Sequence, residues 1–207
     1  AESFERTYLD ESRFPGLAPE LNKLRSEAVD FRHVDSREGG TWTIAGMVSS
    51  LCGVPFPQQD ANGYASIGRF LPGAYCLTDH LRERGYDVEF IGGAASDFAG
   101  KGQFLASHGF GTVRDRSYFK SLKLGDNRFS PWGVHDDVLL DALWDRFAAL
   151  SQQTTPFALV GLTLDTHHPS GHIPHACLDV AYEGLGQRRP MLDAIHCSDR
   201  LVADFVR

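Results

Sequence analysis

The chain has 207 residues, of which 42% are hydrophobic and 23% charged, and this is enough to bury the core of one α/β domain. The formal net charge of −7 argues against a surface that neutralises nucleic-acid phosphates, so no nucleic acid is expected as a partner. No apolar run of about eighteen residues and no signal-peptide pattern is present, so the sequence predicts neither a membrane span nor a leader within these residues. An anionic substrate would need a metal ion or a local cluster of basic groups, because the overall charge repels it.

Helical periodicity dominates the first part of the chain. After a turn at 15–16, apolar residues recur at helical spacing over 17–31 and predict an amphipathic helix. A polar loop then leads into a second predicted helix over 41–51, which the glycine and proline of 53–55 end. Thr41 is therefore expected at a helix N-terminus.

The rest of the chain alternates between helix and strand patterns. The predicted elements are a helix over 76–84, a strand over 87–91, a helix over 98–107, a strand near 112–113, a helix over 136–150, a strand over 157–164 and a helix over 191–206. The apolar run 157–164 is typical of a strand buried on both faces of a parallel sheet. This alternation predicts an α/β fold, and because no repeat or linker interrupts it, residues 1–207 are assigned to one domain.

Four cysteines form an even set, and none has the spacing of a zinc motif. From the count alone, two disulfides in an oxidising compartment and four buried thiols in a cytosolic enzyme fit equally well. The two cysteines of each sequential pair lie at the ends of a segment of about twenty residues. A disulfide that closes such a loop stabilises the folded protein by about 3 kcal/mol. We therefore predict the pairs Cys52–Cys76 and Cys177–Cys197, and with them an oxidising compartment.

Three polar clusters deserve a functional interpretation, because open α/β sheets bind ligands beyond the carboxyl ends of their strands. They are Glu2-Ser3, the segment 39–43 and the segment 165–169. In the second cluster, two glycines allow close backbone approach to an anion, and the Thr41 hydroxyl would face the positive end of a helix dipole. The alternative is that Thr41 or Thr43 only caps the helix.

The segment from Gly40 to Pro55 resembles the nucleophile segment of the phosphoglycerol transferases that modify osmoregulated periplasmic glucans. A related G-T-x-T pattern occurs in phosphoethanolamine transferases, where the first threonine is the nucleophile. The resemblance continues through 1–8, 98–110 and 164–169. It places the chain in the alkaline phosphatase/sulfatase superfamily, together with lipoteichoic acid synthase.

The resemblance implies a sulfatase-like sandwich, a mainly parallel sheet between helices, incomplete at both ends of this chain. It implies that Thr41 is the covalent nucleophile and that Glu2 and Thr41 bind a divalent metal ion, manganese, magnesium or zinc. It also implies that His167 contacts the substrate phosphate. Without the resemblance, a glutamate near a chain end such as Glu2 is usually a solvated charge.

Two further residues fit substrate-side roles in this family context. Lys101 is expected to supply a cation on the substrate side, with an exposed helix lysine as the alternative. Trp132 resembles an aromatic residue that lines the acceptor or head-group pocket in relatives, with core packing as the alternative. A nucleotide P-loop around Lys101 is excluded, because Ala95 replaces its first glycine and Gly102 its serine or threonine.

Other histidines receive no assigned role. The role of His168 beside His167 is open, whereas His172 and His175 are expected to be loop residues, because no cysteine or carboxylate completes a ligand set at standard spacing.

The sequence departs from the family at one point. Relatives place an Asp-His pair after a later strand to complete the metal site, and no such pair follows His168. Asp79-His80 occurs too early and within a predicted helix, so the metal role is not assigned to it. We expect the pair to lie beyond Arg207, and the 207-residue chain alone to lack a complete site and to be inactive.

The predicted function is metal-dependent transfer of phosphoglycerol from a phospholipid donor to a glucan-type acceptor through a threonine-linked intermediate. It would occur at the periplasmic face of the inner membrane, with membrane anchoring through a segment outside this chain. The alternatives are a sulfatase-like phosphodiesterase, a phosphoethanolamine transferase, or a non-catalytic ligand-binding module of the same fold. Sulfate esters are disfavoured, because Thr41 and the residues after it lack the cysteine or serine, proline and arginine that sulfatases need.

Overall fold

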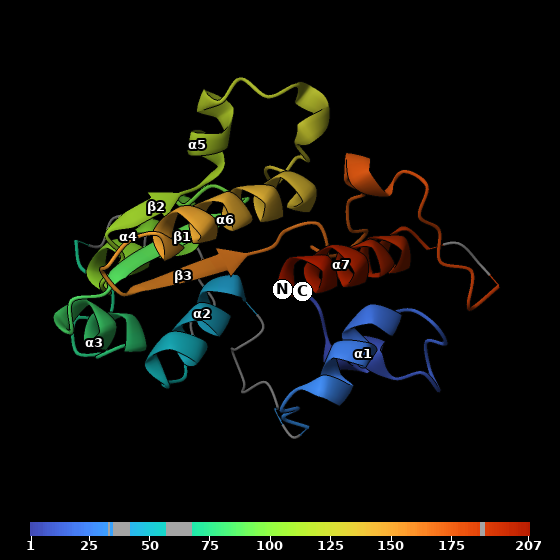
Figure 1. Cartoon of the computed structure of the whole chain (residues 1–207), viewed down its shortest axis with the longest axis horizontal. Coiled ribbons are helices and arrows are strands. Elements are labelled where there is room, and N and C mark those ends of the chain that lie inside the picture. The colour runs from blue at the N-terminus through green and yellow to red at the C-terminus, as the bar shows by residue number, and fades with distance from the viewer. Residues whose placement is uncertain (33, 35–41, 57–67, 187–188) are drawn as a thin grey trace.

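The computed structural model describes residues 1–32, 34, 42–56, 68–186 and 189–207. Thr41, the expected nucleophile, lies outside the described residues. Within them, the chain forms a three-stranded parallel sheet with helices on both of its faces (Figure 1). The predicted α/β class is confirmed.

The sheet has the order β2-β1-β3, so that β1 (Asp87–Gly92) pairs with β2 (Thr112–Arg114) on one side and β3 (Phe157–Leu162) on the other. Phe90 lies opposite Val113 and Val160 in the two ladders. From its second residue onward, β1 is buried throughout, as a central strand covered by helices on both faces should be.

Alternation along β1 divides the core into two layers. Val88 and Phe90 join a buried cluster with residues of α2 (Thr43–Cys52) and α4 (Lys101–Ser107), with α3 (Leu77–Glu83) packed beside them. Ile91 faces the other layer, formed by α5 (Arg116–Ser121), α6 (Asp136–Ser151) and part of α7 (Pro190–Val206). Because successive strand residues point to opposite faces, this short strand anchors both halves of the core.

A buried cluster of charged residues lies between the sheet and α6. The Glu89 side chain on β1 is 1% exposed and forms ion pairs with Arg114 of β2 and Arg146 of α6. Arg114 Nη1 lies 2.5 Å and Arg146 Nε 2.8 Å from Glu89 Oε2. The Arg146 hydrogen bonds, and with them those of Arg114, lower the pKa of Glu89 despite its burial. Two guanidinium groups thus compensate one buried carboxylate.

The first helix, α1 (Pro19–Glu27), packs against α7. No side chain at its own N-cap residue, Ala18, satisfies the first-turn amides. Instead, the carboxylate of Asp199 on α7 accepts hydrogen bonds from the backbone N–H groups of Glu20 (3.0 Å) and Leu21 (2.7 Å). The cap is therefore supplied by the last helix.

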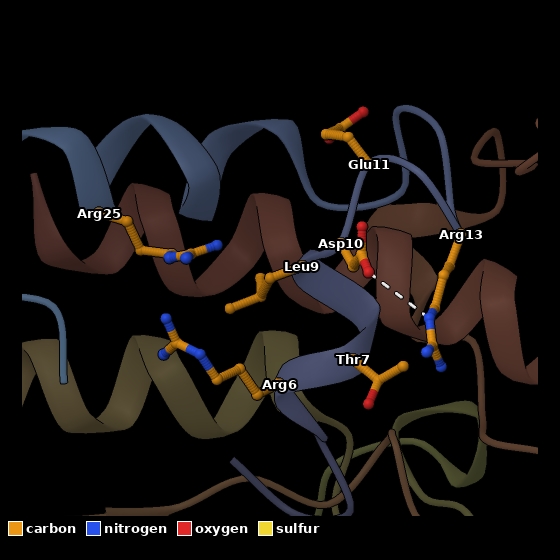
Figure 2. A pocket seen from close by; sticks show the side chains of 7 residues that line it. All are labelled: Arg6, Thr7, Leu9, Asp10, Glu11, Arg13 and Arg25. Atoms are coloured by element: carbon orange, nitrogen blue, oxygen red, sulfur yellow. Dashed lines mark ion pairs between the residues drawn. The ribbon is translucent and has the colours of Figure 1, made fainter. Parts of the chain in front are cut away.

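Helix α1 is shorter than the predicted 17–31, because the chain turns after Glu27. Asp30 leaves the helix and pairs with Arg6 and Arg25. Figure 2 shows these two arginines at a surface hollow beside α1, with Arg13 paired to Asp10 at its far side. Since carboxylates already compensate the arginines, this hollow is a poor anion site.

Two other expectations about the helices need correction. The predicted helix 98–107 is a 3-10 turn over Phe98–Gly100 followed by α4, because Ala99 and Gly100 adopt φ values of 56° and 73°. Left-handed backbone cannot continue a right-handed helix. Helix α5 was not predicted, since six residues are too few to show a helical period; Asp115 caps it by accepting a hydrogen bond from Ser117 N.

The prediction for β3 was also partly wrong. The strand ends at Leu162 rather than 164, and its residues are half-buried or exposed instead of buried on both faces. Among the described residues β3 is an edge strand, paired only with β1. Beyond it, the Leu164 backbone N–H donates to the Asp136 carboxylate at 2.6 Å, which draws the chain out of the ladder toward α6.

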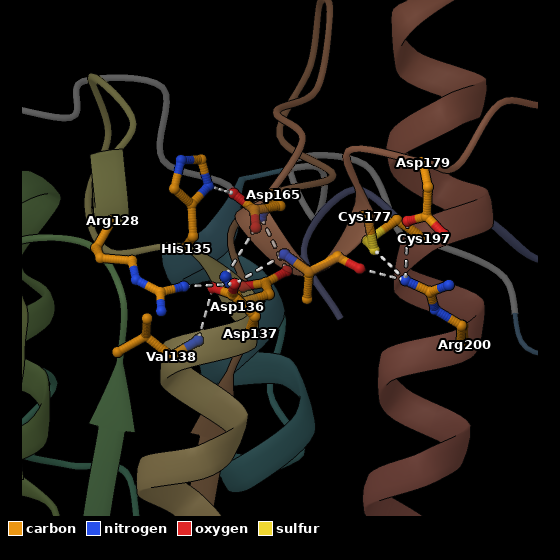
Figure 3. Close-up of a disulfide and its surroundings, with 11 residues drawn as sticks. Arg128, His135, Asp136, Asp137, Val138, Asp165, Cys177, Asp179, Cys197 and Arg200 are labelled. Atoms are coloured by element: carbon orange, nitrogen blue, oxygen red, sulfur yellow. Dashed lines mark hydrogen bonds and ion pairs between the residues drawn. A yellow bond between two sulfur atoms is a disulfide. The ribbon is translucent and has the colours of Figure 1, made fainter. Parts of the chain in front are cut away.

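Two disulfides join the predicted pairs of cysteines. Cys52 at the end of α2 is bonded to Cys76 at the start of α3. Cys177 is bonded to Cys197 on α7, as Figure 3 shows. The bonds close segments of 24 and 20 residues.

We expect native protein to resist thiol alkylation at all four cysteines. Reduction should lower the free energy of unfolding by about 3 kcal/mol for each loop that is released, because the unfolded chain regains conformational freedom. Mass spectrometry after alkylation, with and without reductant, checks the pairing. Four freely alkylated thiols in unreduced native protein would contradict both the pairs and the oxidising compartment.

Candidate active site

A cavity of about 350 Å³ opens where β1 and β3 end and α2 begins. This is the edge at which parallel sheets usually bind ligands. Its lining comes from six separate parts of the chain: Glu2; Trp42, Thr43 and Ile44; Ala94, Ala95, Asp97, Phe98, Ala99 and Lys101; Arg116; Pro131 and Trp132; and Leu162, Thr163, Leu164 and His167.

Four residues singled out from the sequence line this cavity: Glu2, Lys101, Trp132 and His167. Thr41 lies outside the described residues, but its neighbours Trp42 and Thr43 are part of the lining. The structure therefore brings together side chains that are up to 165 positions apart in the sequence, from Glu2 to His167.

Hydrogen bonds fix Glu2 on all sides. Its backbone N–H donates to Thr163 Oγ1 at 3.0 Å, just after β3. Its two carboxylate oxygens accept from the hydroxyls of Thr43 (2.9 Å) and Ser3 (3.1 Å), and its carbonyl accepts from the Thr166 hydroxyl. Glu2 is thus an oriented carboxylate in the cavity wall rather than a solvated terminal charge.

The start of α2 contradicts the alternative that Thr43 caps the helix. Trp42 occupies the N-cap position and makes no side-chain capping bond. Thr43 is the first helical residue, and its hydroxyl donates to Glu2 instead of capping the helix. The capping explanation for Thr43 was therefore wrong, and the open first turn of α2 faces the cavity.

Lys101 is only 6% exposed, which excludes the exposed-lysine alternative. The left-handed residues Ala99 and Gly100 precede it and direct the first turn of α4 against the cavity. Burial lowers the pKa of Lys101, although the charges of Asp115 and Glu2 oppose the shift. Within the described chain its ammonium group has no hydrogen-bond or ion-pair partner, so it is available to an anion.

Trp132 and His167 form an aromatic pair at the cavity. Their rings are stacked with centroids 4.3 Å apart, and Trp132 is 45% exposed, so it is not a core residue. His167 Nδ1 lies 2.7 Å from the His168 carbonyl oxygen, which can only accept a hydrogen bond. Nδ1 therefore carries a proton, and Nε2 is the nitrogen left to interact with a ligand.

A buried network that sequence reasoning missed holds the loop bearing His167. Asp136, at the start of α6, accepts backbone N–H groups from Leu164 (2.6 Å) and Asp165 (3.0 Å). Asp165 in return accepts from the Asp136 N–H and from His135 Nδ1, both at 2.7 Å (Figure 3). The only sequence signal was His135-Asp136 before a helix and Asp165 after a strand.

Electrostatics in this network follow from its burial. Burial, with the nearby charge of Asp165, raises the pKa of Asp136. Burial alone would lower the pKa of His135, but its hydrogen bond to Asp165 raises it overall. The network thus pairs a readily protonated histidine with Asp165, while backbone amides compensate both carboxylates.

Comparison with known proteins identifies the family. The sulfatase family profile, described as "Sulfatase", matches residues 1–207, the whole chain.

The chain belongs to the sulfatase family. Phosphoglycerol transferase I of Xanthomonas campestris pv. campestris is 53% identical over 207 residues, which are 99% of this chain and 30% of that protein. Phosphoglycerol transferase I of Salmonella choleraesuis is 41% identical over 206 residues, 99% of this chain and 27% of that protein. The chain therefore spans less than a third of the length of these relatives. The family resemblance noted in the sequence is confirmed.

Solved structures show the same fold. An alkaline phosphatase superfamily protein from Vibrio parahaemolyticus matches with a TM-score of 0.67 and 22% identity, covering 96% of this chain and 46% of that one. The lipoteichoic acid synthase LtaP from Listeria monocytogenes matches with a TM-score of 0.66 and 18% identity, covering 92% and 45%. The predicted alkaline-phosphatase-like architecture is confirmed. No helix among the described residues is long and apolar enough to cross a membrane.

The sequence led us to expect a divalent metal ion. In the described cavity wall, Glu2 is a carboxylate held by a hydrogen bond that could bind such an ion. In the described structure, the two carboxylate oxygens of Glu2 accept hydrogen bonds from the hydroxyl groups of Ser3 and Thr43. These hydroxyl groups can rotate away when an ion binds. Hard oxygen ligands of this type suit magnesium or manganese and are also accepted by zinc. Glu2 therefore fits a metal as one ligand of a larger set.

Cys76, Asp79 and His108 form the one group of three close metal-ligand side chains in the described part of this sulfatase-family chain. Cys76 is bonded to Cys52, so it offers no thiolate. His108 Nδ1 lies 2.9 Å from Asp79 Oδ2 and its Nε2 lies 2.8 Å from the Phe70 carbonyl oxygen, so both ring nitrogens already have partners within the protein. The group is a buried structural cluster, and Asp79-His80 remains without a metal role.

The remaining loop histidines do not line the cavity. His172 has its backbone N–H bonded to the Asp165 carbonyl at 2.7 Å, and burial lowers the pKa of its side chain. His175 begins a short 3-10 turn, and its side chain is exposed, as is that of His168. His172 and His175 are thus loop residues, as expected.

Proposed function

We propose that the protein containing this chain transfers phosphoglycerol from a phospholipid to a hydroxyl group of a glucan-type acceptor. The observation that carries the proposal is the cavity, in which Glu2, Lys101, Trp132 and His167 meet at the open N-terminus of α2. The 53% identity to a phosphoglycerol transferase I supports this reaction over others of the sulfatase family.

The proposed nucleophile is Thr41. Its oxygen forms a bond to phosphorus, the bond from phosphorus to the diacylglycerol oxygen breaks, and the leaving oxygen takes up a proton. An acceptor hydroxyl then attacks the phosphoglycerol-threonine, releases Thr41 and loses its own proton. Glu2 and Thr41 would hold a divalent ion, which supplies charge neutralisation and a lower hydroxyl pKa when bound.

The described residues suit the phosphate in complementary ways. Lys101 presents a desolvated ammonium group that has no ion-pair partner among the residues that the structure describes. His167 presents Nε2, held in place by its bond to the His168 carbonyl and by stacking on Trp132. The exposed part of Trp132 offers an apolar surface for the glycerol carbons. These groups bind and orient the head group while the N-terminus of α2 faces the reacting end.

The disulfides support a location outside the reducing cytosol, which fits the periplasmic face of the inner membrane. There, a phospholipid donor and a glucan acceptor would both be accessible. Membrane attachment would come from residues outside this chain. This location is part of the proposal.

The test is a transfer assay with the full-length protein, vesicles of a phospholipid bearing a labelled phosphoglycerol head group, and a β-glucan acceptor. We expect labelled glucan and diacylglycerol as products. His167→Gln should reduce kcat/KM by about 10- to 100-fold, because a hydrogen bond to a charged group is lost. His175→Gln, at an exposed histidine of the same region, is the matched control and should match wild type.

Release of free glycerol phosphate without labelled glucan would indicate a hydrolase. Labelled product that forms only with a phosphoethanolamine donor would indicate a phosphoethanolamine transferase. Absence of any head-group release by full-length protein supplied with manganese, magnesium or zinc would favour the non-catalytic binding module.

A further inference from the structure

The segment Arg114-Asp115-Arg116 connects β2 to α5, and its first two charges are fully compensated. Arg114 pairs with the buried Glu89. Asp115 Oδ2 accepts from the backbone and hydroxyl of Ser96 (2.9 and 2.6 Å), and Oδ1 from those of Ser117 (2.8 and 2.5 Å). Although burial opposes ionisation, these donors lower the pKa of Asp115 to about 2. Asp115 is thus ionised, and both of its carboxylate oxygens are engaged by Ser96 and Ser117.

Arg116 has no counter-charge in the part of the chain that the structure describes. Its Nε is buried and has no hydrogen-bond partner, and no other hydrogen bond or ion pair of its side chain exists within the described ranges. Native proteins rarely leave buried donors unsatisfied, because each loses its hydrogen bonds to water. An unsatisfied guanidinium N–H in a native structure therefore indicates an external partner.

The position of Arg116 indicates what that partner is. Arg116 lines the same cavity as Lys101 and His167. The carboxylates that line it with them are Glu2, whose oxygens accept hydroxyl hydrogen bonds, and Asp97, whose side chain is exposed. Among the described residues, the cavity therefore has two cations in its lining, Lys101 and Arg116, that form no ion pair.

We propose that Arg116 binds the phosphate oxygens of the donor substrate, together with Lys101. A guanidinium group can form two parallel hydrogen bonds to a phosphate, whereas the Lys101 ammonium group acts as a compact charge. The two side chains enter from different elements, α5 and α4, so they can contact different oxygens of one phosphodiester. This inference rests on the proposed function and adds a specificity-determining residue to it.

The test compares Arg116→Gln, Arg116→Lys and Lys120→Gln in the full-length protein. Lys120 is an exposed cation on the same helix, so Lys120→Gln controls for loss of one positive charge. Donor kcat/KM should fall by about 10- to 100-fold in Arg116→Gln and less in Arg116→Lys, which keeps the charge. The KM for the glucan acceptor should not change, and Lys120→Gln should behave as wild type.

Thermal unfolding separates a substrate role from a structural one. Removing an unsatisfied buried donor should leave the melting temperature of Arg116→Gln unchanged or raise it. A lower melting temperature together with lost activity that lysine does not restore would overturn the proposal. Unchanged donor kcat/KM, or an effect confined to the glucan KM, would overturn it as well.

A binding measurement keeps this inference distinct from the proposed reaction. If the wild-type protein transfers nothing, calorimetry with glycerol 1-phosphate still compares the same variants. At least about a tenfold loss of affinity in Arg116→Gln, partly restored in Arg116→Lys, supports the phosphate contact. Equal affinity in wild type and Arg116→Gln refutes it. If the glutamine variant does not fold, a measurable loss of affinity in Arg116→Lys supports the contact, and wild-type affinity in Arg116→Lys refutes it.

Discussion

Thr41→Ala should abolish phosphoglycerol transfer in the full-length protein, with a loss of at least about 10³-fold, because the proposed intermediate cannot form without the hydroxyl. The fold should be retained. Trp42 is the N-cap residue of α2, and the hydroxyl that reaches Glu2 belongs to Thr43. Even a lost capping bond would lower the free energy of unfolding by only about 0.5–2 kcal/mol.

Three measurements check this expectation: the transfer rate, the melting temperature, and mass spectrometry of protein trapped with donor. Wild type should carry a phosphoglycerol adduct on Thr41, and Thr41→Ala none. Thr41→Ser is the matched control, since it keeps a hydroxyl and should retain measurable transfer. Undiminished turnover by Thr41→Ala would remove Thr41 as the nucleophile.

Glu89→Ala should lower the free energy of unfolding by about 3–5 kcal/mol, because it removes one partner of a buried ion-pair cluster. The change leaves the guanidinium groups of Arg114 and Arg146 close together without their carboxylate. Their side chains are only 22% and 24% exposed, so water compensates them incompletely. Urea unfolding of the full-length protein, followed by circular dichroism, measures the difference.

Asp10→Ala is the comparison for Glu89→Ala. Asp10 pairs with Arg13 at 3.5 Å, with both side chains well exposed, so its loss should cost less than about 1 kcal/mol. Similar small costs for both variants would show that the buried cluster contributes little.

The Glu89 cluster also has a defined pH dependence. The pKa of Glu89 is lowered in the folded protein, chiefly by Arg146. Its contribution to stability is therefore complete above the ordinary glutamate pKa and is lost as the pH falls through the lowered folded value. In Glu89→Ala the unfolding free energy should change less with pH over this acidic range.

Much of the architecture could be predicted from hydrophobic periodicity. The bounds of β1, α6 and α7 each differ from prediction by one residue, because each of these elements has a strong apolar pattern. The break before α4 was missed, because Ala99 does not signal left-handed backbone. The exposure of β3 was missed because an apolar run predicts that a strand forms but does not predict whether the strand lies at the centre or the edge of the sheet.

The candidate site was only partly predictable. Family resemblance identified Glu2, Lys101, Trp132 and His167 one by one, but the cavity that joins them depends on contacts between distant segments. Nothing in the sequence pointed to Arg116. Its role became apparent only from the structure, in which Asp115 accepts hydrogen bonds from Ser96 and Ser117, and Arg116 has no counter-charge among the described residues.

The cap that Asp199 supplies to α1 has a consequence for the order in which the protein folds. A helix of nine residues is too short to be stable alone, and its capping partner is 178 to 179 positions later in the chain. Glu2 likewise depends on Thr163, 161 positions away. During synthesis, α1 and Glu2 must therefore wait until β3 and α7 have emerged, so Glu2 takes its place in the cavity wall only after the sheet of the described chain has formed.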